Sequence, residues 1–345
     1  MGLEIQRGLK TTAQRRELPL RRVIGTPSPL RIIFFGTPDF AEAGLRALND
    51  SIHVVVGVVT APDKPAGRGQ RVTASAVKTA AVELGLPLAQ PARLRNPDFL
   101  AQLDRWQADV FCVVAFRMLP EVVWNRPRLG TINVHGSLLP DFRGAAPIQH
   151  AVASGAHHTG VTTFFITREI DTGALLLQRG CAIRPSDTAG TVYTKLMTEG
   201  AGLLVDTLDA LAWGAIQGIP QDQLMTGSER DAPKLFRQDG RIDWRLSADQ
   251  VCYFIRGMTP FPGAWTTLNG ATFKVHQVES LAPPEGLPDL EPGRCQTANG
   301  QWWVGTGTSP ILLHTAQLAG KPAMPAEDIL RGYRYPVDEL GTQGH

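Results

Sequence analysis

The first half of the chain alternates apolar runs of strand length with segments whose apolar residues repeat at helical spacing. We expect strands at 31–35, 53–59, 109–115 and 131–135, with helices between them at 39–48, 73–84 and 98–106. Such alternation predicts a doubly wound parallel sheet, an α/β fold with helices on both faces. Reactive groups in these sheets lie at the carboxyl ends of strands. Gly36, Thr60, Ala115 and His135 should therefore open onto one crevice.

The second half of the chain has a different pattern of expected helices and strands. A long helical segment at 191–213 is followed by residues 214–234, a mixture of Gly, Pro, Gln, Asp and Ser that is typical of a linker. Beyond a helix at 247–256, with Ser247 as its N-cap, short strands are expected at 264–268, 271–278, 301–304 and 311–316. Their spacing predicts a small, OB-like β-barrel. We therefore expect a domain at 31–213, a linker at 214–234 and a second domain at 235–345.

Residues 1–30 stand apart from both regions. They hold six basic residues against two acidic ones, and they contain no apolar stretch of signal-peptide length. We expect a basic arm without a fixed fold, or a start site placed too early. An organelle transit peptide, which is also basic, is the alternative.

Charge and cysteine usage exclude several classes of protein. The net charge of +2 means that any nucleic acid must be recognised through a local basic patch. The cysteines are isolated, without a CxxC pair or a neighbouring histidine, and predict neither a zinc site nor a disulfide framework: Cys112, Cys181, Cys252 and Cys295. Apolar runs stay far below the roughly 20 residues of a membrane span. These features predict a soluble, cytoplasmic protein with no metal and no membrane partner.

The turn after the first strand does not fit a dinucleotide site. Its sequence, Gly36-Thr-Pro-Asp-Phe-Ala-Glu-Ala-Gly44, lacks the GxGxxG spacing, and Pro38 occupies part of the turn. No acidic residue closes the second strand at the position that would bind a ribose. A Walker A loop is also absent from the sequence. The pattern therefore disfavours a dehydrogenase.

Asn133 and His135 point to the same side of one expected strand, because side chains two residues apart share a face. An amide can donate a hydrogen bond to a developing oxyanion while an imidazole moves a proton, which is the requirement of acyl transfer. Alone, such a pair is more often satisfied by nearby backbone. Asp171, in a turn after an expected strand at 162–166, supplies a carboxylate that can orient the histidine or take a proton, although Asp-x-Gly alone is typical of a turn. Only the three residues together would make a catalytic site.

A loop rich in Gly and Pro follows the second strand and carries three cations, Lys64, Arg68 and Arg71. Its place at the crevice mouth suits phosphate contacts that position a polyanion without reading its sequence. A solvated basic loop is the alternative reading.

Several strings occur in the order typical of one family: Phe35-Gly-Thr-Pro-Asp-Phe40, Pro65-Ala-Gly-Arg-Gly69, Asn133-Val-His-Gly-Ser-Leu-Leu-Pro140, Arg143-Gly-Ala-Ala-Pro147, Asp171-Thr-Gly173, Arg241-Ile-Asp-Trp244 and Pro260-Phe-Pro-Gly263. Over about residues 31–334 the chain resembles the methionyl-tRNA formyltransferases. The resemblance implies a Rossmann-like catalytic domain followed by an OB-like tRNA-binding domain. It also implies 10-formyltetrahydrofolate as formyl donor.

The resemblance assigns roles to individual residues. It gives Asn133, His135 and Asp171 as the catalytic trio, and the residues expected to line the folate site are Ser137, Leu138, Leu139, Pro140, Phe116 and Met118. Phe40 lies where the family contacts the methionyl side chain, and Arg68 matches the loop arginine that approaches the tRNA acceptor end. One departure is the segment Ala115-Phe-Arg-Met-Leu-Pro120, which is one residue shorter than usual and has Arg117 in place of a small residue.

The implied activity is formyl transfer to the free amino group of the methionyl moiety of initiator methionyl-tRNA, for translation initiation. Lys64, Arg68 and Arg71 would bind the tRNA, with no role for DNA. The same trio could serve a formyltransferase acting on a sugar-nucleotide amine, which would not need the basic loop. A formyltetrahydrofolate hydrolase, a glycinamide ribonucleotide formyltransferase and a tRNA-binding module without catalysis are further alternatives.

Overall fold

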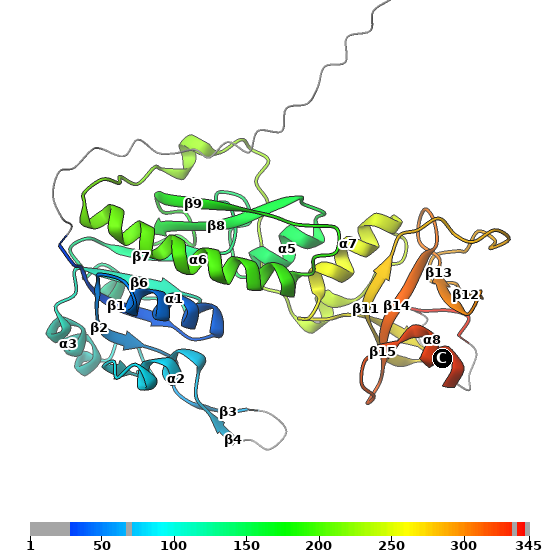
Figure 1. Ribbon diagram of the computed structural model, residues 1–345, viewed down its shortest axis with the longest axis horizontal. Coiled ribbons are helices and arrows are strands. Elements are labelled where there is room, and N and C mark those ends of the chain that lie inside the picture. Colours follow the sequence, from blue (N-terminus) through cyan, green and yellow to red (C-terminus); the bar gives the residue numbers. More distant parts are fainter. Residues whose placement is uncertain (1–27, 67–70, 333–336, 342–345) are drawn as a thin grey trace, which may run out of the picture.

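The structure is a computed structural model that describes residues 28–66, 71–332 and 337–341. Two parts lie side by side along its longest axis, an α/β part and a smaller β part (Figure 1). Nearly all of the expected basic arm, and the tip of the basic loop with Arg68, lie outside the described residues.

The α/β part is built on a seven-stranded sheet. Its strands in spatial order are β5 (Leu88–Ala89), β2 (Val54–Val59), β1 (Arg31–Gly36), β6 (Val110–Val114), β7 (Thr131–His135), β8 (His158–Phe165) and β9 (Leu175–Ala182). The first five strands run parallel, whereas β8 and β9 are antiparallel to their neighbours. The prediction of a mostly parallel, doubly wound sheet is confirmed.

Helices cover both faces of this sheet. One face packs against α1 (Asp39–Asn49), α2 (Ala76–Glu83) and α6 (Ala189–Ala212), and the other against α3 (Pro97–Trp106) and α4 (Glu121–Trp124). Strand residues alternate between the two cores, because successive side chains of a strand point to opposite faces. In the described residues, no helix has the length and apolar character needed to cross a membrane.

Several local expectations differ from the structure. The helix expected at 73–84 begins at Ala76, after Ser75 caps it by accepting a hydrogen bond from the Lys78 N–H. The loop before it contains a short hairpin, β3 (Lys64–Ala66) and β4 (Arg71–Thr73). Helix α5 (Pro147–Ala153) and strand β9 had no counterpart among the expected elements, and β8 begins at His158 rather than at residue 162.

The β part is an antiparallel sheet that its C-terminal segment closes. Its strand order is β10 (Ala264–Leu268), β11 (Ala271–Glu279), β14 (Ile311–Leu318), β13 (Gln301–Val304) and β12 (Cys295–Ala298), with β15 (Met324–Pro325) beside β14. Leu340 bridges to Leu268 at one edge while Glu339 bridges to Arg294 near the other. The expected antiparallel barrel is therefore present, flanked by α7 (Ala248–Met258) and α8 (Ala326–Gly332).

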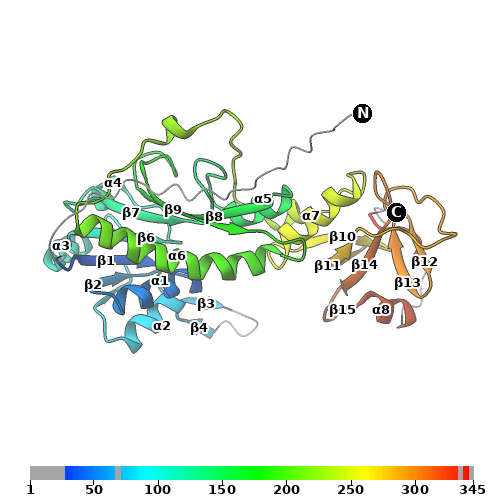
Figure 2. The same cartoon turned by 45° about the horizontal axis from the view of Figure 1, so that its top comes forward.

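The segment between α6 and α7 is held against the α/β part. It leaves the far end of α6 and returns along the sheet toward α7 (Figures 1 and 2). Its backbone pairs at Ile219 with Leu175 and at Asp231 with Arg143, and it contains two 3-10 turns, η1 (Gln221–Leu224) and η2 (Arg237–Gly240). Residues 214–234, expected to be a linker, thus form part of the α/β structure.

Candidate active site

Strand β7 brings Asn133 and His135 to the sheet face that also carries α3 and α4. Its other residues, Ile132 and Val134, belong to the core under α1 and α6, and Asn133 pairs with Val113, which belongs to the opposite core. The pair therefore projects from one strand to one side, as the spacing predicts. His135 is the last residue of β7, at the carboxyl end of the parallel sheet.

The ring of His135 is almost fully buried, with 6% of the residue exposed. Its Nε2 lies 2.8 Å from the carbonyl oxygen of Phe142. Because a carbonyl oxygen can only accept, Nε2 must carry a proton. Nδ1 then faces the carboxylate of Asp171, with 3.6 Å between Nδ1 and Oδ2. The backbone thus fixes the ring so that its second nitrogen is directed at an acid.

Asp171 reaches the histidine from the loop between β8 and β9. Its backbone is left-handed, with φ 54°, and its Oδ2 accepts a hydrogen bond of 3.0 Å from the Gly144 N–H. Gly173 allows the loop to fold this closely, because a Cβ there would lie 1.7 Å from the carbonyl oxygen of Phe165. The position of the loop is therefore fixed at Asp171 by a hydrogen bond and at Gly173 by close packing against Phe165.

Asn133 is half-buried like Asp171, but it differs from its two partners because its amide has no hydrogen-bond partner among the residues that the structure describes. A half-buried amide with a free N–H can donate to an oxygen of a bound molecule. The three residues thus combine a free donor, a fixed imidazole and an acid within one small region.

Gln221, which the sequence analysis did not single out, supports this region. Its side chain is 3% exposed and donates from Nε2 to the carbonyl oxygens of Asp171 and Gly173, at 2.8 Å each. Nothing in its sequence context distinguishes it from the other polar residues of a segment that is predicted to be a linker. Its burial depends on partners far away in the chain.

The turn after β7 contains four of the residues expected to line the folate site. The Ser137 hydroxyl donates to the Asp141 carbonyl oxygen at 2.6 Å, and the Leu139 N–H donates to the Thr162 hydroxyl at 3.1 Å. Ser137 and Leu139 are buried, whereas Leu138 and Pro140 are half-buried. The turn therefore presents a fixed backbone, with the Ser137 and Leu139 side chains directed into the protein.

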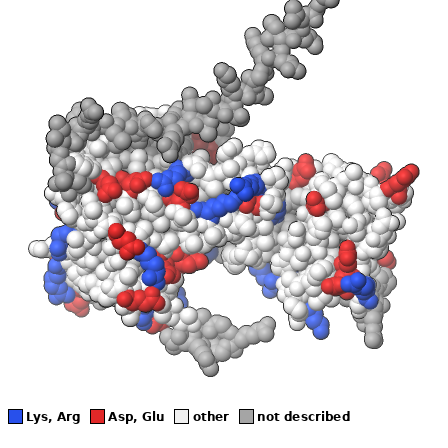
Figure 3. Space-filling view, in the orientation of Figure 1, with Lys and Arg blue, Asp and Glu red and all other residues white. Residues whose placement is uncertain are grey.

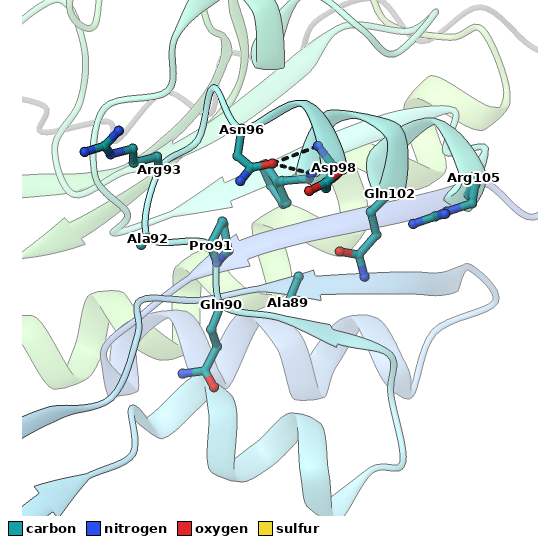
Figure 4. A pocket seen from close by; sticks show the side chains of 10 residues that line it. Ala89, Gln90, Pro91, Ala92, Arg93, Asn96, Asp98, Gln102 and Arg105 are labelled. Atoms are coloured by element: carbon teal, nitrogen blue, oxygen red, sulfur yellow. Dashed lines mark hydrogen bonds between the residues drawn. The ribbon is translucent and has the colours of Figure 1, made fainter.

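Two pockets of about 460 and 410 Å³ lie next to each other after β5 and β6, and Arg93 lines both. Figure 4 shows the first, where Asn96 caps α3 by accepting hydrogen bonds from the Asp98 and Phe99 N–H groups. Met118, 74% exposed, lines the second. Of the expected folate residues in this segment, Met118 is thus at a cavity.

Arg117 lines the second pocket, and Phe116, the residue before it, packs against the core. The Phe116 ring packs edge-on against Phe35, with 5.8 Å between ring centroids. The Arg117 guanidinium lies over the Phe116 ring and donates to the carbonyl oxygens of Pro91 and Ala92. The arginine that departs from the family pattern therefore ties the loop after β6 to the loop after β5.

The residues expected to bind the second substrate lie on two elements, α1 and the basic loop after β2. Phe40 is 7% exposed and packs in the core beneath α6, with its ring 5.2 Å from that of Tyr193. Burial and a hydrogen bond to Asp39 raise the pKa of Tyr193. Lys64 is exposed on β3, Arg71 begins β4, and Arg68 lies outside the described residues.

Within the described ranges, no group of three or more His, Cys, Asp or Glu side chains is arranged to hold a metal ion. Asp63 directly precedes the basic hairpin, and the hydrogen bond from Lys78 lowers the pKa of its carboxyl, with a second contribution from Gln90. This carboxylate is therefore committed to an ion pair at the base of the hairpin.

Comparison with known proteins gives a consistent result over most of the chain. Residues 30–208 match the family described as "Formyl transferase", and residues 234–334 match "Formyl transferase, C-terminal domain". A methionyl-tRNA formyltransferase of Bacteroides fragilis is 44% identical over 309 residues, covering 88% of this chain and 95% of that protein. The Parabacteroides distasonis methionyl-tRNA formyltransferase is 45% identical over 314 residues, covering 88% and 96%.

Solved structures share the fold at low sequence identity. HypX from Aquifex aeolicus in complex with tetrahydrofolic acid has a TM-score of 0.59 at 17% identity, covering 90% of this chain and 49% of that one. The sugar 3N-formyl transferase WlaRD has a TM-score of 0.59 at 15% identity, covering 86% and 100%. Since relatives above 40% identity span nearly the whole described chain, it belongs to the methionyl-tRNA formyltransferase family.

Proposed function

We propose that this protein transfers the formyl group of 10-formyltetrahydrofolate to the free amino group of the methionyl moiety of initiator methionyl-tRNA. The observation that carries the proposal is the amide of Asn133, which has no partner in the described part of the chain and lies beside the fixed His135 and Asp171 pair at the carboxyl end of the parallel strands. The curated relatives at 43–45% identity, which are methionyl-tRNA formyltransferases, support the choice of acceptor.

The residues divide the chemistry as follows. The amine attacks in its neutral form, and Asp171 takes, directly or through a water, the proton that the attacking nitrogen must lose as its bond to carbon forms. A bond forms between the amine nitrogen and the formyl carbon, and Asn133 donates to the formyl oxygen as this carbon becomes tetrahedral. The bond from the carbon to the folate nitrogen then breaks, and His135 supplies the proton that the departing nitrogen needs.

The fixed tautomer of His135 supports this division. With Nε2 held by the Phe142 carbonyl, a proton can enter or leave the ring only at Nδ1, on the side that faces Asp171. The proton taken from the amine therefore stays in one carboxylate and imidazole pair until the leaving group needs it. No net proton is gained or lost by the protein over the cycle.

Two neighbouring features provide binding surfaces. The two pockets that share Arg93, the second of which Met118 also lines, lie at the same sheet edge and suit the folate. Figure 3 shows a hollow between the two parts of the molecule, with Lys and Arg side chains of the barrel at its border. Strands β3 and β4, at the base of the loop expected to bind tRNA through Lys64, Arg68 and Arg71, project toward this side (Figures 1 and 2). Cations at these places would hold the tRNA backbone, and the binding would weaken with salt.

The test measures transfer of labelled formyl from 10-formyltetrahydrofolate in three reactions. One contains methionyl initiator tRNA, one contains a UDP-amino-sugar, and one contains no acceptor. Formylation of the tRNA alone is the expected result. Turnover with the sugar would retain the chemistry and overturn the acceptor. Release of formate without an acceptor would point to a hydrolase, and no reaction in any arm would leave a tRNA-binding module.

A further inference from the structure

Gln221 is buried in a segment that is otherwise polar and exposed. It begins η1 and is 3% exposed, whereas the two residues after it, Asp222 and Gln223, are exposed. Burying an amide costs free energy unless its donors and its acceptor are all paired. The partners of this one side chain must therefore account for its burial.

Every hydrogen-bonding position of the Gln221 amide is used. Its two N–H groups donate to the carbonyl oxygens of Asp171 and Gly173, at 2.8 Å each. Its Oε1 accepts from Nε and from a terminal nitrogen of Arg143, at 3.0 and 2.6 Å. A side-chain amide has no further capacity. The pattern also fixes the orientation of the amide, because the reverse orientation would set its oxygen against two carbonyl oxygens.

The two ends of this amide hold the two loops on which the site depends. On one side lies Asp171, whose left-handed backbone costs free energy and needs support from its surroundings. On the other side lies Arg143, between Phe142, which accepts from His135, and Gly144, which donates to the Asp171 carboxylate. A single buried side chain thus links the backbone of the acid to the loop that orients the histidine.

We propose that Gln221 is a positioning residue that holds the Asp171 carboxylate against Nδ1 of His135 during formyl transfer, an inference that rests on the proposed function. It does not touch the reacting atoms and acts through Asp171. The segment between the two parts of the protein therefore contributes to catalysis as well as connecting them. A glutamate at this position could still accept from Arg143 but would place a second acceptor against the carbonyl oxygens of residues 171 and 173.

The first experiment compares Gln221→Glu with Gln223→Glu. Both variants add one negative charge to the same 3-10 turn, but Gln223 is exposed. We expect Gln221→Glu to lower kcat by about 10- to 100-fold, as a displaced catalytic group does, with KM for both substrates changed by less than about 2-fold. Gln223→Glu should retain the wild-type kcat. Equal activity of the two variants would overturn the proposal.

A double-mutant cycle with Asp171→Asn separates positioning from general support of the fold. If Gln221 acts through Asp171, the two losses are not additive, and Gln221→Glu should cost less than about 3-fold in the Asp171→Asn background. A merely structural role would give the same loss of kcat in both backgrounds, which would overturn the proposal. Gln221→Met, which is neutral and of similar length, replaces Gln221→Glu in the cycle if the latter does not fold.

A second measurement does not depend on any substrate. Nitrogen-15 NMR of the histidine rings reports the environment of His135 Nδ1, once its signals are assigned with a His135→Gln variant. We expect Gln221→Glu and Asp171→Asn to shift these signals in the same direction, and Gln223→Glu to leave them in place. An unchanged His135 spectrum in folded Gln221→Glu would overturn the proposal, whereas a wild-type protein without formyl transfer would overturn only the proposed function.

Discussion

The carboxyl edge of the α/β sheet and the core of the barrel are held together by different kinds of contact. At the sheet edge, buried polar groups such as His135, Thr162 and Gln221 are satisfied by hydrogen bonds to backbone carbonyl oxygens. The barrel core is a cluster of apolar side chains around Trp302 and Phe273, whose rings lie 5.5 Å apart. Hydrogen bonds fix positions, whereas apolar burial supplies stability without direction. Substitutions in the two regions should therefore separate stability from catalysis.

The largest effect is expected from Trp302→Ala in the barrel. Trp302 is fully buried, and truncating such a side chain costs about 3–5 kcal/mol. Hydrogen exchange followed by mass spectrometry should show this loss in β11, β13 and β14, with little change in β6 and β7. Phe261→Ala, at a residue that is 64% exposed, is the matched truncation and should change protection little. A similar loss in both parts would show that the molecule unfolds as one unit and that the distinction fails.

Asn133→Ala, at the sheet edge, should lower the rate of catalysis without lowering stability. Its amide has no partner in the described part of the chain, so removing it leaves no buried group unsatisfied. Loss of one donor to an oxyanion lowers kcat by about 100-fold or more. We expect that loss in the formyl-transfer assay, with wild-type hydrogen exchange. Asn125→Ala, at an exposed position, is the control. Near-native turnover of folded Asn133→Ala would remove Asn133 from the mechanism.

The sequence predicts the elements that have a local apolar pattern and fails for those that depend on distant partners. Strands β1 and β6 were predictable because they are short apolar runs buried on both faces, and β7 because it follows a turn that contains Gly and Pro. Strand β9 was not predicted. Its last six residues alternate between half-buried and exposed positions and include Gly180, so the sequence there contains no continuous apolar run. The fixed conformation of residues 214–234 was not predicted either, because it depends on backbone pairing with Leu175 and Arg143 rather than on a local sequence pattern.

The candidate site was predictable to the extent that it lies on one strand. The i, i+2 spacing placed Asn133 and His135 on one face, as the structure has them. The approach of Asp171 came from the resemblance, because a loop that folds back over a sheet leaves no periodic signal. Gln221 had no signal, since a polar side chain in a polar segment becomes distinctive only when its distant partners enclose it.

A smaller effect is expected where the two regions meet. A terminal nitrogen of Arg256 on α7 donates to the carbonyl oxygens of Arg184, Pro185 and Asp187, at 3.2, 2.7 and 3.3 Å. Arg256→Met keeps the aliphatic stem and loses these contacts, at a cost of about 1–2 kcal/mol. We expect faster hydrogen exchange confined to residues 183–191, with both cores unchanged. Arg245→Met, at an exposed ion pair within the barrel, is the control. Weakening that spreads into β7 or β13 would show that the junction supports the cores.

The smallest effect concerns the pH dependence of the α/β part alone. His53 is 5% exposed, its Nδ1 accepts from the Leu30 N–H at 3.2 Å, and its Nε2 lies 3.2 Å from Asp209. Burial lowers the pKa of His53, and Asp209 opposes this only in part. The unfolded chain therefore binds a proton at His53 more readily than the folded one, and stability falls as the pH drops from 7.5 to 5.5.

His53→Asn keeps a short acceptor for Leu30 but does not titrate, so its urea midpoint should fall less over this interval than that of the wild type. His314→Asn, at a half-buried histidine in the barrel, is the matched control and should keep the wild-type slope. Hydrogen exchange at the lower pH should weaken first around β1 and β2, where His53 lies, while the barrel keeps its protection. An unchanged slope in His53→Asn would mean that the acid sensitivity arises elsewhere, and an equal response in the barrel would remove the last difference between the two regions.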